Sequence, residues 1–310
     1  MENEESSESI ISLKNISKTF GAVTALDNLT TEIGIGATGL LGPNGSGKTT
    51  LIRTLLGLIK PDSGSGTVLG LDIHSQQLDI RRQIGFAPED DTIFPGVHGI
   101  ESVAYAGELC GMPRKDAMQR AHEVLDYVGL GEVRYRKVES YSSGMKQRLK
   151  LAAAIVHDPK LLIMDEPTNG MDPAGREHIL KLAGDLSSNK RMSLIFSSHL
   201  LPDVETVCRR IVVLSAGKLL IEGDISELKK VHSGSFELRL KEPPDPFIEH
   251  ISARGCAVEK VGEILRVAVP SGEGPELLWR QASADGVQIR HLRPQRSTLE
   301  EIFLGAVERR

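Results

Sequence analysis

The chain has 310 residues, of which 40% are hydrophobic and 25% charged, which is enough for one large globular domain and a smaller one. Its formal net charge of −5 argues against a general nucleic-acid-binding surface, because such surfaces need an excess of basic residues. The cysteines Cys110, Cys208 and Cys256 are odd in number and far apart, so reduced thiols are expected rather than disulfides or a zinc site.

The first residues, MENEESSES, are acidic and polar, and they predict a loose tail over residues 1–9. No run of about 18 apolar residues is free of charge, so no membrane-spanning helix is expected. Apolar and polar positions alternate between 11 and 33, on both sides of Gly21, which favours a pair of antiparallel strands.

Three short apolar runs follow, and each ends in residues suited to chemistry. The run at 38–41 leads into a glycine-rich loop, the run at 161–164 into two acids, and the run at 194–196 into Ser-Ser-His199. Between them, helix formers dominate 100–138 and predict helical structure. Apolar strands that alternate with helices are typical of an α/β fold with a mainly parallel sheet, whose strands deliver polar groups to one edge.

The segment GPNGSGKT has the spacing of a phosphate-binding loop, with a strand before it and a helix after it. Its glycines allow the backbone N–H groups to face phosphate oxygens, and the start of the helix adds a positive dipole end. Lys48 is expected to hold the β- and γ-phosphates, and the Thr49 hydroxyl to ligate Mg²⁺. A glycine-rich turn that matches by chance is the weaker interpretation. The expected nucleotide-binding residues here are Gly42, Pro43, Asn44, Gly45, Ser46, Gly47, Lys48, Thr49 and Thr50.

Asp165 and Glu166 follow the second apolar run directly. Carboxylates at the end of a buried strand need partners, because unpaired buried charges cost several kcal/mol. We expect Asp165 to bind Mg²⁺ through coordinated water, and Glu166 to polarise the attacking water as general base. The alternative is a pair of solvated acids that open a loop. His199 reaches the same edge and could donate to the γ-phosphate, although a lone histidine is more often structural.

The segment YSSGMKQR at 141–148 precedes another helical run. Ser142 is a natural N-cap, so the helix would begin with free N–H groups and offer a second anion site. Without further context, an ordinary capped helix explains this segment equally well.

The phosphate loop, YSSGMKQRL, LLIMDEPTNGMDP and SSHLL occur here in the order and approximate spacing of ABC transporter ATPases, which the chain resembles over about residues 10–225. The resemblance implies a P-loop NTPase cassette over 10–230, with a mainly parallel sheet core, an antiparallel β subdomain and a helical subdomain at about 95–158. It also implies ATP and Mg²⁺ as cofactors.

In that family two ATPase subunits, identical or different, sandwich two ATP molecules head to tail. The resemblance therefore implies that Ser142 and Gly144 contact the nucleotide of the other subunit. The loop from Asn169 to Asp172 would link the two sites, and Phe20 would stack on adenine.

Two segments depart from the family pattern. The signature is commonly LSGGQ, and here Met145 replaces the glutamine, so it cannot form an amide hydrogen bond to the nucleotide sugar. The loop that usually carries glutamine near the magnesium ion has Glu89 instead. Glu89 could ligate Mg²⁺, but it adds a negative charge beside two acids and the phosphates. Neither change removes the general base, so hydrolysis is still expected.

YSSGMKQRL, the APED loop and the ending TLEEIFLGAVE resemble the exporter branch, whose ATPase and membrane subunits are separate chains. The helical insert and the Glu89 loop would receive a cytoplasmic helix of the membrane subunit, at the cytoplasmic face of the membrane. The alternative is an ABC ATPase that acts on DNA or ribosomes. A P-loop kinase or GTPase has no use for the signature helix.

Strand-like and helical stretches after about residue 235 predict a separate α+β domain over 235–310. Dimer stabilisation, a regulatory contact and a passive appendage all remain open as roles for it. The transported substrate and the direction of transport are not predicted by the residues of this chain.

Overall fold

The computed structural model describes residues 9–90, 95–189, 192–229, 235–241, 245–270, 273–294 and 299–300. It divides into two compact units, a cassette unit Met1–Ile225 and a C-terminal unit Ser226–Arg310. Outside the described residues lie residues 1–8 of the predicted tail. The same holds for 230–234, where the boundary between the two predicted domains was expected. The first strand already begins at Ser9.

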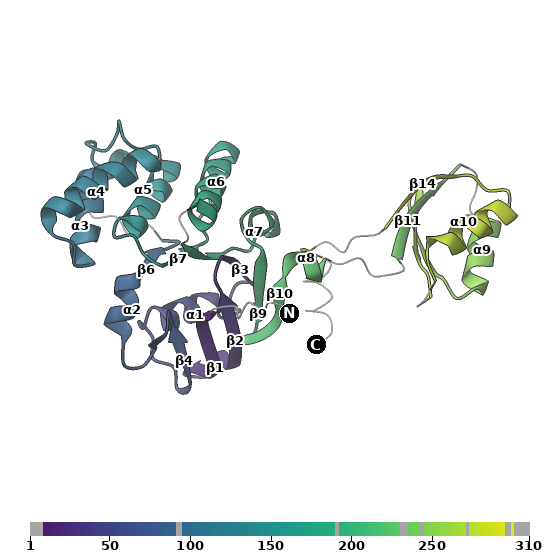
Figure 1. Ribbon diagram of the computed structural model, residues 1–310, viewed down its shortest axis with the longest axis horizontal. Coiled ribbons are helices and arrows are strands. Elements are labelled where there is room, and N and C mark those ends of the chain that lie inside the picture. Colours follow the sequence, from purple (N-terminus) through teal and green to yellow (C-terminus); the bar gives the residue numbers. More distant parts are fainter. Residues whose placement is uncertain are drawn as a thin grey trace, which may run out of the picture. The chain divides into compact units, whose positions relative to one another are not determined.

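The core of the cassette unit is a six-stranded sheet in the order β10-β9-β3-β8-β7-β6 (Figure 1). Five of these strands are parallel, and β10 is an antiparallel edge strand. Every residue of β7 and β8 is buried, as a parallel sheet covered on both faces requires. The strands are β3 (Ala37–Leu41), β6 (Ile84–Ala87), β7 (Leu161–Asp165), β8 (Ser193–Ser197), β9 (Arg210–Ser215) and β10 (Lys218–Asp224). The prediction of a mainly parallel sheet is confirmed.

A second, antiparallel sheet has the order β2-β1-β4-β5. A tight turn at Gly21, which has a φ of 58°, joins the two long strands as expected. Leu13 and Leu26 of this sheet pack in one hydrophobic cluster with Leu40 and Ile163 of the six-stranded sheet. The two sheets therefore share a core. The strands are β1 (Ser9–Phe20), β2 (Val23–Gly34), β4 (Ser63–Val68) and β5 (Leu71–Asp72).

Three helices, α3, α4 and α5, pack together at one end of the cassette unit (Figure 1). Helical structure was predicted within 100–138, and the structure has two helices there. A glycine with a φ of 95°, Gly111, and Pro113 after it separate α3 from α4, and α4 ends at Tyr127. The helices of this unit are α1 (Lys48–Leu55), α2 (Gln77–Gln83), α3 (Gly99–Leu109), α4 (Arg114–Tyr127), α5 (Ser143–Ile155), α6 (Pro173–Asn189) and α7 (Leu201–Val207), with a 3₁₀ turn at Val138–Ser140.

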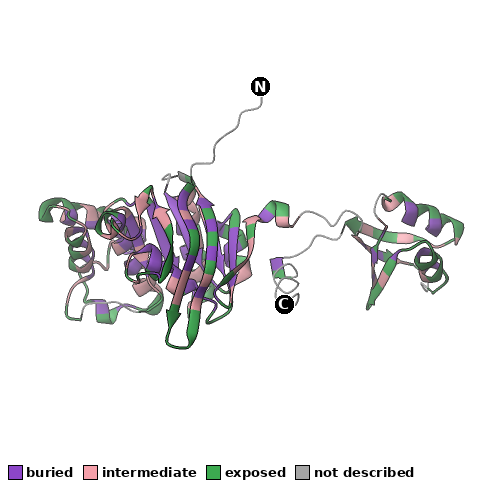
Figure 2. Cartoon of the chain, turned by 90° about the horizontal axis from the view of Figure 1, so that it is seen from below, coloured by how far each residue is buried: buried purple, intermediate pink, exposed green. Residues whose placement is uncertain are grey.

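The C-terminal unit is a βαββαβ arrangement with an antiparallel sheet in the order β12-β13-β11-β14. Phe236 and Leu238 of β11, one of the two central strands, pack against Phe247 and Leu278 of the helices. Together these residues belong to a hydrophobic core within this unit. Figure 2 shows buried residues in both the strands and the helices of this unit. After α8 (Ile225–Leu228), its elements are β11 (Ser235–Leu240), α9 (Asp245–Ala253), β12 (Ala257–Val261), β13 (Ile264–Ala268), α10 (Pro275–Ala284) and β14 (Ile289–Pro294).

The α+β prediction is confirmed for this unit. The ending TLEEIFLGAVE, one of the predicted helical stretches, lies almost entirely outside the described residues. Among the helices that the structure describes, none has the length and apolar character needed to cross a bilayer.

Candidate functional site

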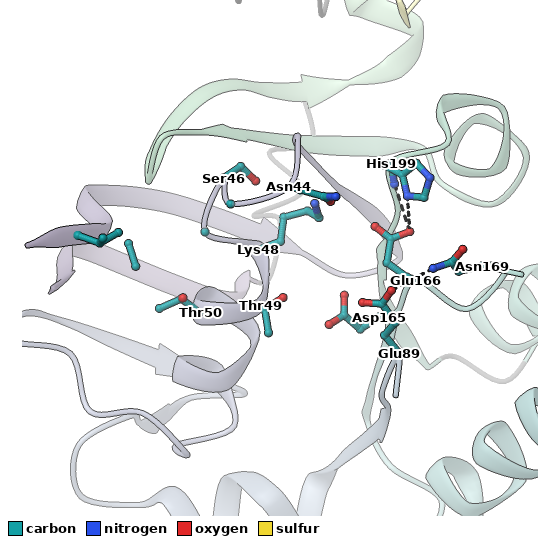
Figure 3. Close-up of a pocket in the computed structure, with 14 residues that line it drawn as sticks. Asn44, Ser46, Lys48, Thr49, Thr50, Glu89, Asp165, Glu166, Asn169 and His199 are labelled. Atoms are coloured by element: carbon teal, nitrogen blue, oxygen red, sulfur yellow. Dashed lines mark hydrogen bonds and ion pairs between the residues drawn. The ribbon is translucent and has the colours of Figure 1, made fainter. Parts of the chain in front are cut away.

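A cavity of about 330 Å³ lies where the parallel strands end, and it collects residues that are far apart in the sequence (Figure 3). The loop after β3 forms one wall, and residues at or beyond the ends of β6, β7 and β8 form the other. Its lining comprises Val23, Ala25, Asn44, Gly45, Ser46, Gly47, Lys48, Thr49, Thr50, Glu89, Asp165, Glu166, Asn169 and His199. Every residue predicted to be catalytic or to bind a metal is in this set.

The loop between β3 and α1 can take its shape only with glycine at two positions. Gly42 and Gly47 have φ values of 154° and 106°, and a Cβ on either would lie 2.5 Å or less from a backbone oxygen. The hydroxyl of Ser46 is buried and has no hydrogen-bond partner within the described residues. Since α1 begins directly at Lys48, its free N–H groups and this hydroxyl suit an anion at the loop.

The Lys48 side chain folds back over the loop that precedes it. Its Nζ donates to the carbonyl oxygens of Gly42 at 2.7 Å and Pro43 at 3.4 Å, and the residue is only 7% exposed. An ammonium group has three donors, so at least one remains for an anion in the cavity.

Three carboxylates face this loop across the cavity (Figure 3). Asp165 is the last residue of β7, and burial raises the pKa of its carboxyl above the ordinary value, with the nearby charges of Glu166 and Glu89 acting in the same direction. A bound cation would stabilise the charged form of this buried carboxylate.

Glu166 is held by the histidine predicted to join it. Nδ1 of His199 lies 2.8 Å from Oε2 of Glu166, and the backbone N–H of His199 donates to the same oxygen at 3.4 Å. The predicted hydrogen bond from His199 to the γ-phosphate would use the other ring nitrogen, Nε2. Only a doubly protonated imidazole can donate to Glu166 and to a phosphate at once. Glu166 also has a φ of 46°, in the left-handed region that non-glycine residues rarely adopt, and such strain is common at functional sites.

Glu89, two residues after β6, receives a hydrogen bond from a residue that was not among the predicted site residues. Nδ2 of Asn169 donates to Oε1 of Glu89 at 3.0 Å, so two loops that are 80 residues apart meet at the cavity. Val23 and Ala25 of β2 also line it without having been predicted. Asn169 begins the loop 169–172 that the resemblance assigned to linking the two sites, and this assignment was the signal available for it.

The loop that leads from Glu166 to α6 is anchored by a buried aspartate of α7. Asp203 is 1% exposed and accepts hydrogen bonds from the Thr168 hydroxyl at 2.6 Å and from Nε of Arg176 at 2.7 Å. A second guanidinium nitrogen of Arg176 lies 2.6 Å from the same carboxylate oxygen. This cluster fixes both ends of the segment that contains Asn169 and Asp172.

The other predicted contact residues lie outside the cavity lining. Ser142 caps α5 and accepts a hydrogen bond from the Met145 N–H at 3.3 Å, as predicted. Ser142, Gly144 and Asp172 were predicted to serve the nucleotide of another subunit or to link the two sites. Phe20 is 48% exposed, with the Lys18 ammonium 5.5 Å from its ring centre, and its contact with adenine stays a prediction.

The residues of the cavity fit a nucleoside triphosphate and a hard divalent cation. Backbone amides and Lys48 supply donors for phosphate, and Mg²⁺ is usually held by one or two carboxylates, a hydroxyl and phosphate oxygens. Within the part of the chain that the structure describes, no three His, Cys, Asp or Glu side chains converge as a complete metal site. Thr49 and Asp165 fit a cation that phosphates help to bind.

The sequence matches two family models in succession. Residues 26–169 match the model described as ABC transporter, and residues 223–307 match the C-terminal domain of DrrA1-3-like ATP-binding proteins. The chain is 32% identical over 308 residues to the linearmycin resistance ATP-binding protein LnrL of Bacillus subtilis. The alignment covers 97% of this chain and 99% of LnrL. It is 32% identical over 299 residues to the bacitracin transport ATP-binding protein BcrA of Bacillus licheniformis. That alignment covers 95% of this chain and 96% of BcrA.

Solved cassettes share the fold of the first unit. The dimeric ABC transporter cassette MJ0796 superimposes with a TM-score of 0.64 at 26% identity, covering 69% of this chain and 98% of that one. The cbiO1 protein from Clostridium perfringens, part of the ABC transporter complex cbiONQ, superimposes with a TM-score of 0.65 at 25% identity. The superposition covers 71% of this chain and 90% of cbiO1. The chain therefore belongs to the ABC exporter ATPases, the ATP-binding subunits that hydrolyse ATP to drive transport, and it carries a DrrA-like C-terminal domain.

Proposed function

We propose that two cassettes close head to tail on two ATP molecules and drive antibiotic export through separate membrane subunits. The observation that carries the chemistry is the single cavity in which Lys48, Asp165, Glu166 and His199 meet. Relatives named for linearmycin resistance and bacitracin transport support the substrate class.

In this proposal each side chain has a role that follows from its position. Lys48 holds the β- and γ-phosphates, Glu166 removes a proton from the attacking water, and His199 orients Glu166 through the bond at 2.8 Å. Thr49, Asp165 and Glu89 would hold Mg²⁺, which would neutralise phosphate charge. Because Glu166 is buried and fixed by two N–H groups, it needs little reorganisation before reaction.

In this proposal each ATP site is shared between two subunits, which is why the cassettes would dimerise. Ser142 and the N–H groups that open α5 lie outside this subunit's own cavity lining, where they would offer an anion site to another subunit. We infer that they close over the ATP of the other subunit, and the similarity to the cassette MJ0796, whose structure is dimeric, supports such a pairing. Whether the physiological pair is a homodimer or a heterodimer is not decided by these residues.

We further propose that the ATPase works at the cytoplasmic face of the membrane, bound to integral-membrane subunits. The similarity to cbiO1, which is part of a transporter complex, supports such an assembly. The alternative action on DNA or ribosomes has no support, since the compared relatives are named for transport and resistance.

The test is the variant Glu166→Gln, which keeps the shape of the side chain and one acceptor oxygen but removes the base. ATP turnover should fall at least about 100-fold, as expected for the loss of a general base, while ATP binding persists. Analytical ultracentrifugation should then detect an ATP-bound dimer. Unchanged hydrolysis would remove Glu166 from its proposed role.

Lys48→Ala provides the matched control, because it should lose ATP affinity and therefore form no dimer in ATP. Co-purification of the tagged chain with an integral-membrane protein tests the proposed partner. A tagged chain that recovers only ribosomal or DNA-associated material would support the alternative function.

A further inference from the structure

A buried lysine on the signature helix α5 holds the loop that carries Glu89. Lys150 lies about two helical turns after Ser142 and is 5% exposed. Its Nζ donates to the carbonyl oxygens of Pro88 at 2.9 Å, Glu89 at 2.8 Å and Asp90 at 3.3 Å. One ammonium group therefore gathers three successive carbonyls from a segment about sixty residues earlier.

The hydrogen bonds of Lys150 to this loop are costly to break. A buried ammonium is costly unless it is hydrogen-bonded, and hydrogen bonds from a charged donor are stronger than neutral ones. Moving α5 without the loop would break these bonds inside the protein. The loop is therefore expected to follow the helix as a unit.

The side chain of Glu89 has a second anchor at the cavity. Asn169 donates to its Oε1 at 3.0 Å, from the segment that Asp203 fixes and that ends at Asp172 (Figure 3). Glu89 is thus tied through its backbone to α5, and through its carboxylate to the loop after Glu166.

We propose that Lys150 is a positioning residue that couples the two ATP sites of the dimer by moving Glu89 together with the signature helix. This inference rests on the proposed function, in which Ser142 contacts the nucleotide of the other subunit and Glu89 lies at the metal. Closure of the other subunit's ATP onto the start of α5 displaces the helix, and Lys150 passes that displacement to Glu89. Each site therefore senses ATP in its neighbour.

The first test needs no nucleotide. In the apo protein, Lys150→Met should speed amide hydrogen exchange at least about tenfold in the peptide that spans Pro88 to Asp90, because its anchor is lost. Exchange in the phosphate-loop peptide around Lys48 should not change. Lys181→Met, the same substitution at an exposed lysine of α6, is the matched control and should leave both peptides unchanged.

The second test is a double-mutant cycle with Glu89→Ala. Lys150→Met should lower kcat about tenfold, the effect typical of removing a residue that orients a metal ligand, while the Kd for ATP stays within about twofold. It should also reduce the Hill coefficient of ATP hydrolysis towards one. In the Glu89→Ala background, the further loss from Lys150→Met should be less than about twofold.

Two results would overturn the inference: unchanged exchange at Glu89, or equal losses of kcat in both backgrounds. If Lys150→Met does not fold, Lys150→Gln keeps an amide donor and permits the same measurements. Failure of the proposed function is separate, because it would appear as turnover that survives Glu166→Gln. Normal dependence on Glu166 with additive losses would instead refute the coupling alone.

Discussion

The buried carboxylate of Asp203 permits a quantitative prediction about the loop behind the catalytic base. Arg176→Met removes the guanidinium and leaves Asp203, at 1% exposure, with Thr168 as its remaining side-chain donor among these three residues. Breaking a buried ion pair costs about 3–5 kcal/mol, and the Arg176 side chain is 34% exposed, so water can partly replace it. We expect the cassette to lose about 2–3 kcal/mol of unfolding free energy.

Urea unfolding can measure this loss separately in the two units. The single tryptophan, Trp279, lies on α10 of the C-terminal unit, so its fluorescence reports that unit and should not change. Far-UV circular dichroism reports mainly the cassette. In the background Asp203→Asn, which removes the buried charge, Arg176→Met should cost less than about 1 kcal/mol. A cassette loss under about 1 kcal/mol in the wild-type background would refute the reasoning.

Three other predictions address the site, the domains and the carboxylates. Mixing Ser142→Arg subunits with Lys48→Ala subunits should restore one of the two shared sites in each mixed dimer. If each intact site turns over at its normal rate, mixed dimers should have about half of the two-site activity, and an equimolar, randomly paired mixture about a quarter; a mixture as inactive as either parent would contradict shared sites. Removing residues 230–310 should leave the Kd for ATP within about twofold, because the C-terminal unit has its own core; loss of binding by equilibrium dialysis would show that the units depend on each other. Burial raises the pKa of Asp165 in the folded protein above its value in the unfolded chain, so the unfolded chain loses this proton at lower pH. The unfolding free energy of the nucleotide-free protein should therefore fall as the pH rises from the pKa in the unfolded chain through the pKa in the folded protein. Asp165→Asn should therefore raise the Tm at neutral pH, with the gain shrinking below about pH 4, and an equal gain at both pH values would argue against a titration effect.

Much of the site could be predicted because its motifs depend on residues that are adjacent in the sequence. The phosphate loop and the Asp165–Glu166 pair follow buried strands, and parallel topology then brings their ends together. The α/β class and the α+β character of the second unit were confirmed for the same reason: strand and helix periodicities are local signals. The individual roles of these residues stay predictions.

The remaining features depend on contacts that no local pattern encodes. Lys150 lies in a helical segment, where a lysine is ordinarily expected to face solvent, yet it is buried against a loop sixty residues away. The bond between Asn169 and Glu89 likewise needs the relative placement of two loops.

The order of strands in the six-stranded sheet has a consequence for the synthesis of the protein. Strand β3, which ends one residue before the phosphate loop begins, pairs with β8 and β9 and with no strand made before them. Roughly 170 residues of translation separate Leu41 from Ser215, which takes on the order of 10–30 s at about 5–20 residues per second. A nascent chain therefore carries the complete loop sequence long before the loop has a sheet to hold it, and ATP binding becomes available only when β9 has emerged from the ribosome.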